Sequence, residues 1–435
     1  MSDYMFMLES HLSPEQNKAV GMVEAAAAET GVNAFLTGGA LRDMVGGFPI
    51  QDLDFTAEGD ATKIAKALEK KHGVQVSLVS SARKEYSLVF PNGSRAAICI
   101  AYDARYAKPG SKPKIEPASI NIDLRRRDFT INSIAISLNK GSRGLLLDPN
   151  NGLGDLERRE LRANSNYTLY DDPSRILRMF RLRARLGFEL AEKTQIQYQN
   201  VREAGLESKI SPEAIHDELL RMAYEPNPGD LLEVLEREKL IGLFSPALAG
   251  PKLNTAGFKG LLKTRQMVPF GVDFHADNRG LFLHTLMEKL SDRERKDLIQ
   301  RVGLTKEDLQ PWRDLERRVK KLEATLESAR LNRASLVYET LRKQPGEDVL
   351  YLFLHTGKRL VHDRIKNHLQ KYLETAHEVV DKDLAPLNLE PGTPKFEQAK
   401  LDRIHAILDG RIRKPVPPPE PPPPPPPPTS AWARR

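Results

Sequence analysis

The chain has 435 residues, enough for roughly two to four domains with a sizeable buried core. Hydrophobic residues make up 40% and charged residues 29%, an ordinary composition for a globular protein. The formal net charge of +7 suits an anionic partner, because Lys and Arg displace counterions from phosphates. The single cysteine, Cys99, excludes an internal disulfide framework and a cysteine-rich zinc site.

The N-terminal segment lacks the pattern of a signal peptide, since Asp3 and Glu9 stand where basic residues and then an apolar run would be needed. The apolar stretch at 20–41 contains Glu24, Glu29 and Asn33, which makes it unsuited to cross a bilayer. The sequence therefore predicts a cytoplasmic protein with no membrane partner.

The first 145 residues alternate short apolar runs with helical patterns, which is typical of a mixed α/β domain. We predict a helix at 40–45 and strands at 34–36, 52–55, 86–90 and 96–101. From residue 155 to about 410 the hydrophobic period is helical, with loop signals at 226–229, 344–346 and 391–394. The charged stretch 307–339 indicates a long solvated helix pair.

The last part of the chain is dominated by proline, which occupies twelve of the fourteen positions 415–428. Such a composition favours an extended polyproline II tail without a core.

A glycine-rich segment and two carboxylates form the first candidate site. Residues 38–43 read Gly-Gly-Ala-Leu-Arg-Asp, and Asp52 and Asp54 follow after a short loop. Alternation along a strand puts Asp52 and Asp54 on one face, where paired carboxylates suit Mg²⁺. The glycines allow the backbone to approach a triphosphate, and the next helix presents free N–H groups to it. Either piece alone is more often a plain turn or a solvated strand end, but the two in this order favour a nucleotide site.

Two arginine-rich segments complete the pattern. In the first, residues 123–132, three arginines precede Asp128, and such a run needs an anion or carboxylate as partner. In the second, residues 171–181, Pro173 suits the first position of a helix that aligns its arginines on one face. Asp172 suits a helix N-cap, and together with Arg175 it would also form a donor and acceptor edge able to read a base.

These segments, taken in order, resemble the class II tRNA nucleotidyltransferase and bacterial poly(A) polymerase family over about residues 30–225. Segments 106–117 and 389–396 also resemble parts of a longer-chain branch of that family. The resemblance implies a polymerase-β-like α/β head at 1–145, an all-α neck at 146–225, a helical body and tail at 226–410, and a disordered proline tail at 411–435. It also implies transfer of CMP or AMP from CTP or ATP to an RNA 3′ end, most plausibly that of tRNA.

The resemblance further implies the site residues. Asp52 and Asp54 would hold two Mg²⁺ ions. Gly39 and Arg42 would touch the triphosphate, Arg127 and Asp128 the sugar and phosphates. Asp172 and Arg175 would read the base, and Arg178 and Arg181 would neutralise phosphates. The nucleotide-binding set implied in full is Gly38, Gly39, Arg42, Asp43, Arg127, Asp128, Asn132, Asp172, Arg175, Arg178 and Arg181.

The chain departs from the family pattern at three positions. Cys99 stands where the family has a third carboxylate, and a thiol is a poor ligand for Mg²⁺. Glu85-Tyr86-Ser87 replaces a Phe-Gly-Thr-type segment, and Ala214 replaces an arginine. Asp103, Glu85 and Asp123 are candidates for the missing carboxylate. Two alternative functions therefore stay open, a poly(A) polymerase and a catalytically weakened RNA-binding relative.

Overall fold

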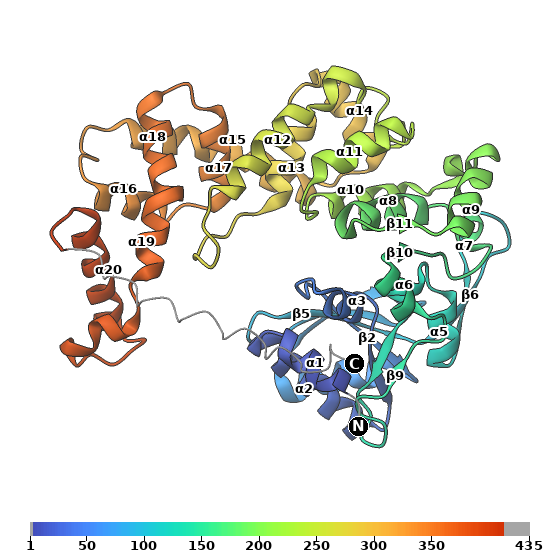
Figure 1. Ribbon diagram of the computed structural model, residues 1–435. Coiled ribbons are helices and arrows are strands. Elements are labelled where there is room, and N and C mark those ends of the chain that lie inside the picture. Colours follow the sequence, from blue (N-terminus) through green and yellow to red (C-terminus); the bar gives the residue numbers. More distant parts are fainter. Residues whose placement is uncertain (1–2, 413–435) are drawn as a thin grey trace, which may run out of the picture. The chain divides into compact units, whose positions relative to one another are not determined.

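The computed structural model describes residues 3–412, so most of the predicted proline tail lies outside the described residues. The described chain forms two compact units, one made of residues 3–258 and 282–309 and the other of 259–281 and 310–412. The predicted mixed α/β head followed by helical regions is confirmed (Figure 1). The first unit contains the head, the region predicted as a neck and part of the helical region beyond it.

A seven-stranded mixed sheet forms the centre of the head. In spatial order its strands are β3 (Gln75–Ser80), β4 (Glu85–Val89), β5 (Arg95–Ile100), β2 (Leu53–Glu58), β1 (Asn33–Thr37), β8 (Ala135–Ser137) and β9 (Leu146–Leu147). β2 and β5 are parallel, and the other neighbours are antiparallel. β1 and β2 are largely buried, and Asp54 is the exposed residue between the buried Leu53 and Phe55 of β2.

Helices and a small hairpin surround this sheet (Figure 1). They are α1 (Asp3–His11), α2 (Pro14–Thr30), α3 (Gly39–Gly46), α4 (Ala61–His72), α5 (Ile120–Arg126), the 3₁₀ turn η1 (Thr130–Asn132), and the hairpin of β6 (Tyr102–Arg105) and β7 (Lys114–Pro117). α2 begins with a capping box of Ser13 and Gln16 and ends at Gly31 in the left-handed conformation. It packs on α4 and β1, while α3 packs on β1 and β2.

The predicted strands correspond to β1, β2, β4 and β5, and the predicted helix at 40–45 lies within α3. The sequence did not predict β3, because it is an edge strand with mostly exposed side chains and no clear alternation. β8 and β9 were also missed, since runs of three and two residues are too short to show a period.

The rest of the first unit is almost entirely helical. Its elements are α6 (Gly152–Arg158), α7 (Thr168–Asp171), α8 (Arg175–Leu186), α9 (Glu192–Glu203), η2 (Leu206–Lys209), α10 (Pro212–Met222), α11 (Pro228–Arg237), η3 (Ile241–Leu243), η4 (Gly250–Leu253) and α14 (Asp292–Val302). One exception to the predicted all-helical pattern is a short parallel pair of β10 (Glu160–Leu161) and β11 (Glu189–Leu190). Three helices contribute residues to both units, namely α12 (Thr255–Gln266), α13 (Asn278–Met287) and α15 (Lys306–Glu327).

The second unit is helical throughout its described residues. It contains α16 (Ala334–Leu341), α17 (Gly346–His355), α18 (Arg359–Asn367), the π-helical turn η5 (His368–Tyr372), α19 (Leu373–Glu378), η6 (Asp381–Leu387) and α20 (Pro394–Leu408). Its core is aliphatic, with Leu315, Val349, Ile365 and Leu369 fully or almost fully buried. Among the described helices of the chain, none is both long and apolar enough to cross a membrane.

Candidate active site

A polar cleft of about 920 Å³ lies within the first unit. Its floor is the exposed face of β1, β2 and β5, and its walls come from α5, α8 and α10. Most of the predicted site residues line it, namely Gly38, Gly39, Asp52, Asp54, Arg127, Asp128, Asn132, Asp172, Arg175 and Arg178. A smaller cavity of about 410 Å³ shares part of this lining and adds the predicted residues Arg42, Asp43 and Arg181. The structure therefore brings together segments that are far apart in the sequence.

Asp52 and Asp54 lie at the start of β2, with Asp54 paired to Thr37 of β1 and to Ala97 of β5. Both side chains are exposed to the cleft, whereas Leu53 between them is buried. Within residues 3–412 neither carboxylate has a hydrogen bond or ion pair to another side chain. Reduced solvation and then repulsion by Asp52 raise the pKa of Asp54. Two unpaired oxygen donors of like charge fit a divalent cation, which would relieve that repulsion.

Gly38 is required by the geometry next to these carboxylates. Its φ is +73°, and a Cβ placed there would lie 3.1 Å from Nη1 of Arg127. Any other residue would therefore adopt a strained backbone and press on the arginine. The turn at Gly38 directs the N-terminus of α3 toward the same cleft, as the sequence predicted.

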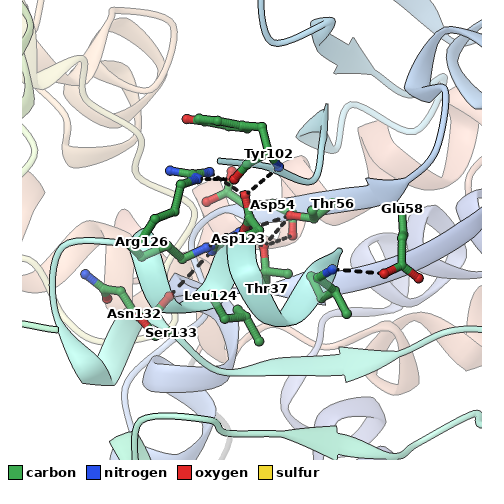
Figure 2. Close-up of polar contacts among 12 residues, drawn as sticks. Thr37, Asp54, Thr56, Glu58, Tyr102, Asp123, Leu124, Arg126, Asn132 and Ser133 are labelled. Carbon is green, nitrogen blue, oxygen red and sulfur yellow. Dashed lines mark hydrogen bonds and ion pairs between the residues drawn. The ribbon is translucent and has the colours of Figure 1, made fainter. Parts of the chain in front are cut away.

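Arg127 is held by a fully buried carboxylate, Asp123, which Figure 2 shows close to Arg126 and Tyr102. Its Nη2 lies 2.8 Å from Asp123 Oδ2 and also donates to the hydroxyls of Thr37 and Thr56. Asp123 pairs with Arg126 as well, and its Oδ1 accepts from the backbone N–H of Tyr102. Arg126 in turn lies over the ring of Tyr102. This network fixes the Arg127 guanidinium beside β2. The negative charge of Asp123 is balanced by Arg126 and Arg127 and is not available to a ligand.

Asp128 connects the head to α8. It forms an ion pair with Arg178 and accepts a hydrogen bond from Asn132 Nδ2 at 3.0 Å. Burial would raise the pKa of Asp128, but the charges of Arg178 and Arg175 outweigh it and hold the pKa below its ordinary value. Asn132 also accepts from Nη1 of Arg42 at 2.8 Å. These groups form a continuous polar network along one wall of the cleft.

The Asp172 and Arg175 pair stands at the beginning of α8. Arg175 Nε lies 3.6 Å from Asp172 Oδ2, and its Nη atoms reach the backbone carbonyls of Arg126 and Arg127. Asp172 Oδ1 accepts from the backbone N–H of Ser174. The prediction of Asp172 as N-cap is nevertheless wrong, because α8 begins at Arg175 and Ser174 is its N-cap residue. Both side chains line the cleft.

Arg42, Asp43 and Arg181 are more enclosed than the prediction of direct phosphate contact implied. Arg42 is buried, with its Nε 2.8 Å from Asp43 Oδ1. Arg181 is 5% exposed and pairs with Glu218 and Glu225 at 2.8 and 3.0 Å. Its charge is therefore already balanced by two carboxylates, and its clearest role in the structure is to tie α8 to α10.

Cys99 faces the cleft on β5, directly beside Thr56 of β2. Burial and the nearby Asp123 raise the pKa of its thiol to about 11, so it is a neutral thiol at physiological pH. It supplies no negative charge to the floor of the cleft.

Sequence reasoning missed several cleft residues. Arg221 of α10 lines both cavities, and Arg83, Arg95 and Tyr102 line the larger one. Arg221 lay in an ordinary amphipathic helical pattern, so only the fold reveals that it faces the site.

Comparison with known proteins gives a family for the head. The Poly A polymerase head domain family matches residues 34–162. The matched residues include β1, β2, β4 and β5 of the central sheet, so this part of the chain is similar to that family. The resemblance predicted from the ordered motifs is thus confirmed.

Relatives extend the similarity beyond this head domain. The chain is 28% identical over 356 residues to an A-adding tRNA nucleotidyltransferase of Aquifex aeolicus, covering 80% of this chain and 41% of that protein. It is 35% identical over 201 residues to a CC-adding tRNA nucleotidyltransferase of Deinococcus radiodurans, covering 46% and 52%. The chain spans about half or less of the length of these relatives.

The fold is also similar to that of solved structures. One is the Thermotoga maritima CCA-adding enzyme complexed with tRNA, with 23% identity, a TM-score of 0.52 and coverage of 95% of this chain and 96% of that one. This likeness concerns the fold alone.

Proposed function

We propose that the chain is a template-independent nucleotidyltransferase that transfers CMP or AMP from CTP or ATP to the 3′ end of RNA, with tRNA as the acceptor. The observation that carries this proposal is the unpaired Asp52 and Asp54 pair on the floor of a cleft walled by arginines. The names of the relatives, which include A-adding and CC-adding tRNA nucleotidyltransferases, support the choice of substrates.

Asp52 and Asp54 would hold two Mg²⁺ ions, which when bound align the attacking and leaving oxygens and stabilise the developing charge. The backbone at Gly38 and Gly39 leaves room for the triphosphate beside them. Arg127, fixed by Asp123, points its guanidinium at the same space. Arg178, although paired with Asp128, lines both cavities and adds positive charge along the phosphate path.

Base selection falls to Asp172 and Arg175 in this proposal. A guanidinium offers donors only and a carboxylate accepts only, so the pair presents a mixed edge to a base. Because Arg175 is oriented by the carbonyls of Arg126 and Arg127, the edge has a defined direction. A protein surface of this kind can select between C and A without a nucleic acid template.

A second candidate is a binding relative with weak catalysis, favoured by the neutral thiol of Cys99 in the cleft. The test is incorporation of labelled CTP and ATP, separately and together, into tRNAs that lack one, two or all three residues of the terminal C-C-A, with and without Mg²⁺. Metal-dependent addition that ends after the terminal A supports CCA addition. Addition of A alone indicates an A-adding enzyme, and long tails on other RNAs indicate a poly(A) polymerase. Binding of tRNA without incorporation overturns the catalytic proposal.

A further inference from the structure

The cleft is lined by a third carboxylate, Glu85 at the start of β4, which is one of the three candidates named from the sequence. Tyr86 of β4 pairs with Ile98 of β5, so Glu85 falls opposite Cys99 in the same antiparallel register. Glu85 and Cys99 both line the cleft. The acidic group is thus one strand away from the position where a carboxylate on β5 would stand.

The side chains between Asp54 and Glu85 are small. Asp54 is opposite Ala97, which is opposite Ser87 of β4, and Cys99 occupies the next position on the cleft face of β5. Two strand spacings and a shift of two residues put the Cα atoms of Asp54 and Glu85 roughly 12 Å apart. Both residues line the same cavity of about 920 Å³, so the space between the two strand positions is open to a ligand.

The Glu85 side chain is partly exposed, and an ion pair with Arg83 fixes its orientation. Its side chain is 22% exposed, and Arg83 Nη2 lies 2.6 Å from its Oε2. This oxygen is buried and accepts no well-directed hydrogen bond within the described residues, so the ion pair with Arg83 is what holds that side of the carboxylate. Arg83 lines the same cleft and keeps the carboxylate at the edge of the floor.

The other carboxylates near Cys99 are less suited to a reacting group. Asp123 is fully buried and engaged by Arg126 and Arg127. Asp103 pairs with Arg105 on β6 and does not line either cavity described above.

We propose that Glu85 is the general base for the RNA 3′-hydroxyl, an inference that rests on the proposed nucleotidyl transfer. The hydroxyl oxygen forms a bond to the α-phosphorus of the nucleotide while its proton passes to the Glu85 carboxylate. The bond from that phosphorus to the bridging oxygen breaks, and pyrophosphate leaves with the electron pair. Cys99 would then be tolerated because the carboxylate function has moved from β5 to β4.

The test uses the full-length chain and four variants. Glu85→Gln removes the base with little change of volume, and Cys99→Asp restores an acid on β5. The double variant combines them. Glu116→Gln, on the exposed β7 beside Lys114, is the matched control outside the cleft. The readouts are kcat and KM for the incorporated nucleotide, binding of Mn²⁺ followed by electron paramagnetic resonance, and the thermal unfolding midpoint.

We expect Glu85→Gln to lower kcat by about 10²-fold or more, the usual range for a general base, with KM, Mn²⁺ binding and midpoint close to wild type. The double variant should recover at least about tenfold of that loss, since the carboxylate returns to the floor. Unchanged kcat in Glu85→Gln, an equal loss of Mn²⁺ binding, or no recovery in the double variant each overturns the proposal.

Failure of the proposed function gives a different result. If wild type is inactive but Cys99→Asp incorporates nucleotides, the transferase architecture stands and Glu85 is not the base. If both are inactive, nucleotidyl transfer itself is wrong and the role of Glu85 falls with it.

Discussion

The floor of the cleft and the arginine face of α8 differ in whether their charged side chains have partners of opposite charge. On the floor, Asp52 and Asp54 have no cationic partner within the described residues, and the pKa of Asp54 is raised. On α8, Arg175, Arg178 and Arg181 each pair with a carboxylate. A charge without a partner costs free energy in the folded protein, so it marks a place for a ligand. A paired charge is already balanced in part, and its pairing fixes the orientation of the side chain.

Asp54→Asn on the floor of the cleft should have the largest effect on nucleotide incorporation. We expect loss of incorporation by at least about 10³-fold, because metal-ion stabilisation of the transition state amounts to several kcal/mol. The unfolding midpoint should not fall, since the amide removes repulsion from Asp52 that raises the pKa of Asp54. Single-turnover incorporation and thermal unfolding measure both effects. Asp103→Asn, a strand carboxylate outside both cavities, should leave both values at wild type. A large loss of stability in Asp54→Asn would contradict this assignment.

Arg181→Met should instead lower the stability of the fold, which Asp54→Asn leaves unchanged. Removal of Arg181 leaves the buried Glu218 without its partner, whereas Glu225 keeps its pair with Arg185. Breaking a buried pair costs about 3–5 kcal/mol. Denaturant unfolding measures this loss. Arg183→Met is the matched control, because its partner Glu189 is exposed and such surface pairs contribute at most about 1 kcal/mol. Unchanged stability together with weaker nucleotide binding would return Arg181 to the predicted phosphate-binding role.

Arg175→Ala and Arg178→Ala should distinguish base selection from phosphate binding on α8. The Arg175→Ala substitution removes the donor half of the base-reading edge, while Asp172 keeps its hydrogen bond from the backbone N–H of Ser174. We expect the ratio of kcat/KM for CTP and ATP to change by about tenfold, one good hydrogen bond to a charged group, with little change in tRNA affinity. Arg178→Ala should instead weaken both nucleotides alike. Equal losses in Arg175→Ala would indicate that Arg175 binds phosphate.

Much of this site could be predicted from the sequence because its residues occur in short segments with fixed spacing. Gly38, Gly39, Asp52 and Asp54 occur within seventeen residues, and strand alternation alone puts the two carboxylates on one face. The fold class followed from the change of hydrophobic period near residue 155. All of the predicted residues line one of two neighbouring cavities.

The roles of individual charges could not be predicted in the same way. The pairing of Arg181 depends on Glu218 and Glu225, which lie about forty positions away. Glu85 was one of three candidate carboxylates in the sequence, and the register of β4 on β5 is what puts it opposite Cys99. Periodicity shows which face a residue occupies, but counterions and strand partners come from contacts distant in the sequence.

The smallest expected effect concerns His216 on α10, at the edge of the cleft wall. Its Nε2 lies 2.9 Å from Asp308 Oδ2. Partial burial would lower the pKa of His216, but hydrogen bonds and charge from Asp308 and Asp217 outweigh it and raise the pKa above 6.5. Burial would likewise raise the pKa of Asp308, whereas its hydrogen bonds hold that pKa below 3.8. The pair is therefore fully formed between about pH 4 and 6.5, and its contribution is lost as pH rises through the raised pKa of His216.

His216→Gln tests this dependence because the amide does not titrate. The unfolding midpoint of wild type should exceed that of the variant most clearly near pH 5.5, and the difference should shrink by pH 8.5. Since the ring is partly exposed, the contribution is at most about 1 kcal/mol. A difference in unfolding midpoint that stays constant over this pH range would mean that His216 stabilises α10 through packing and not through its charge.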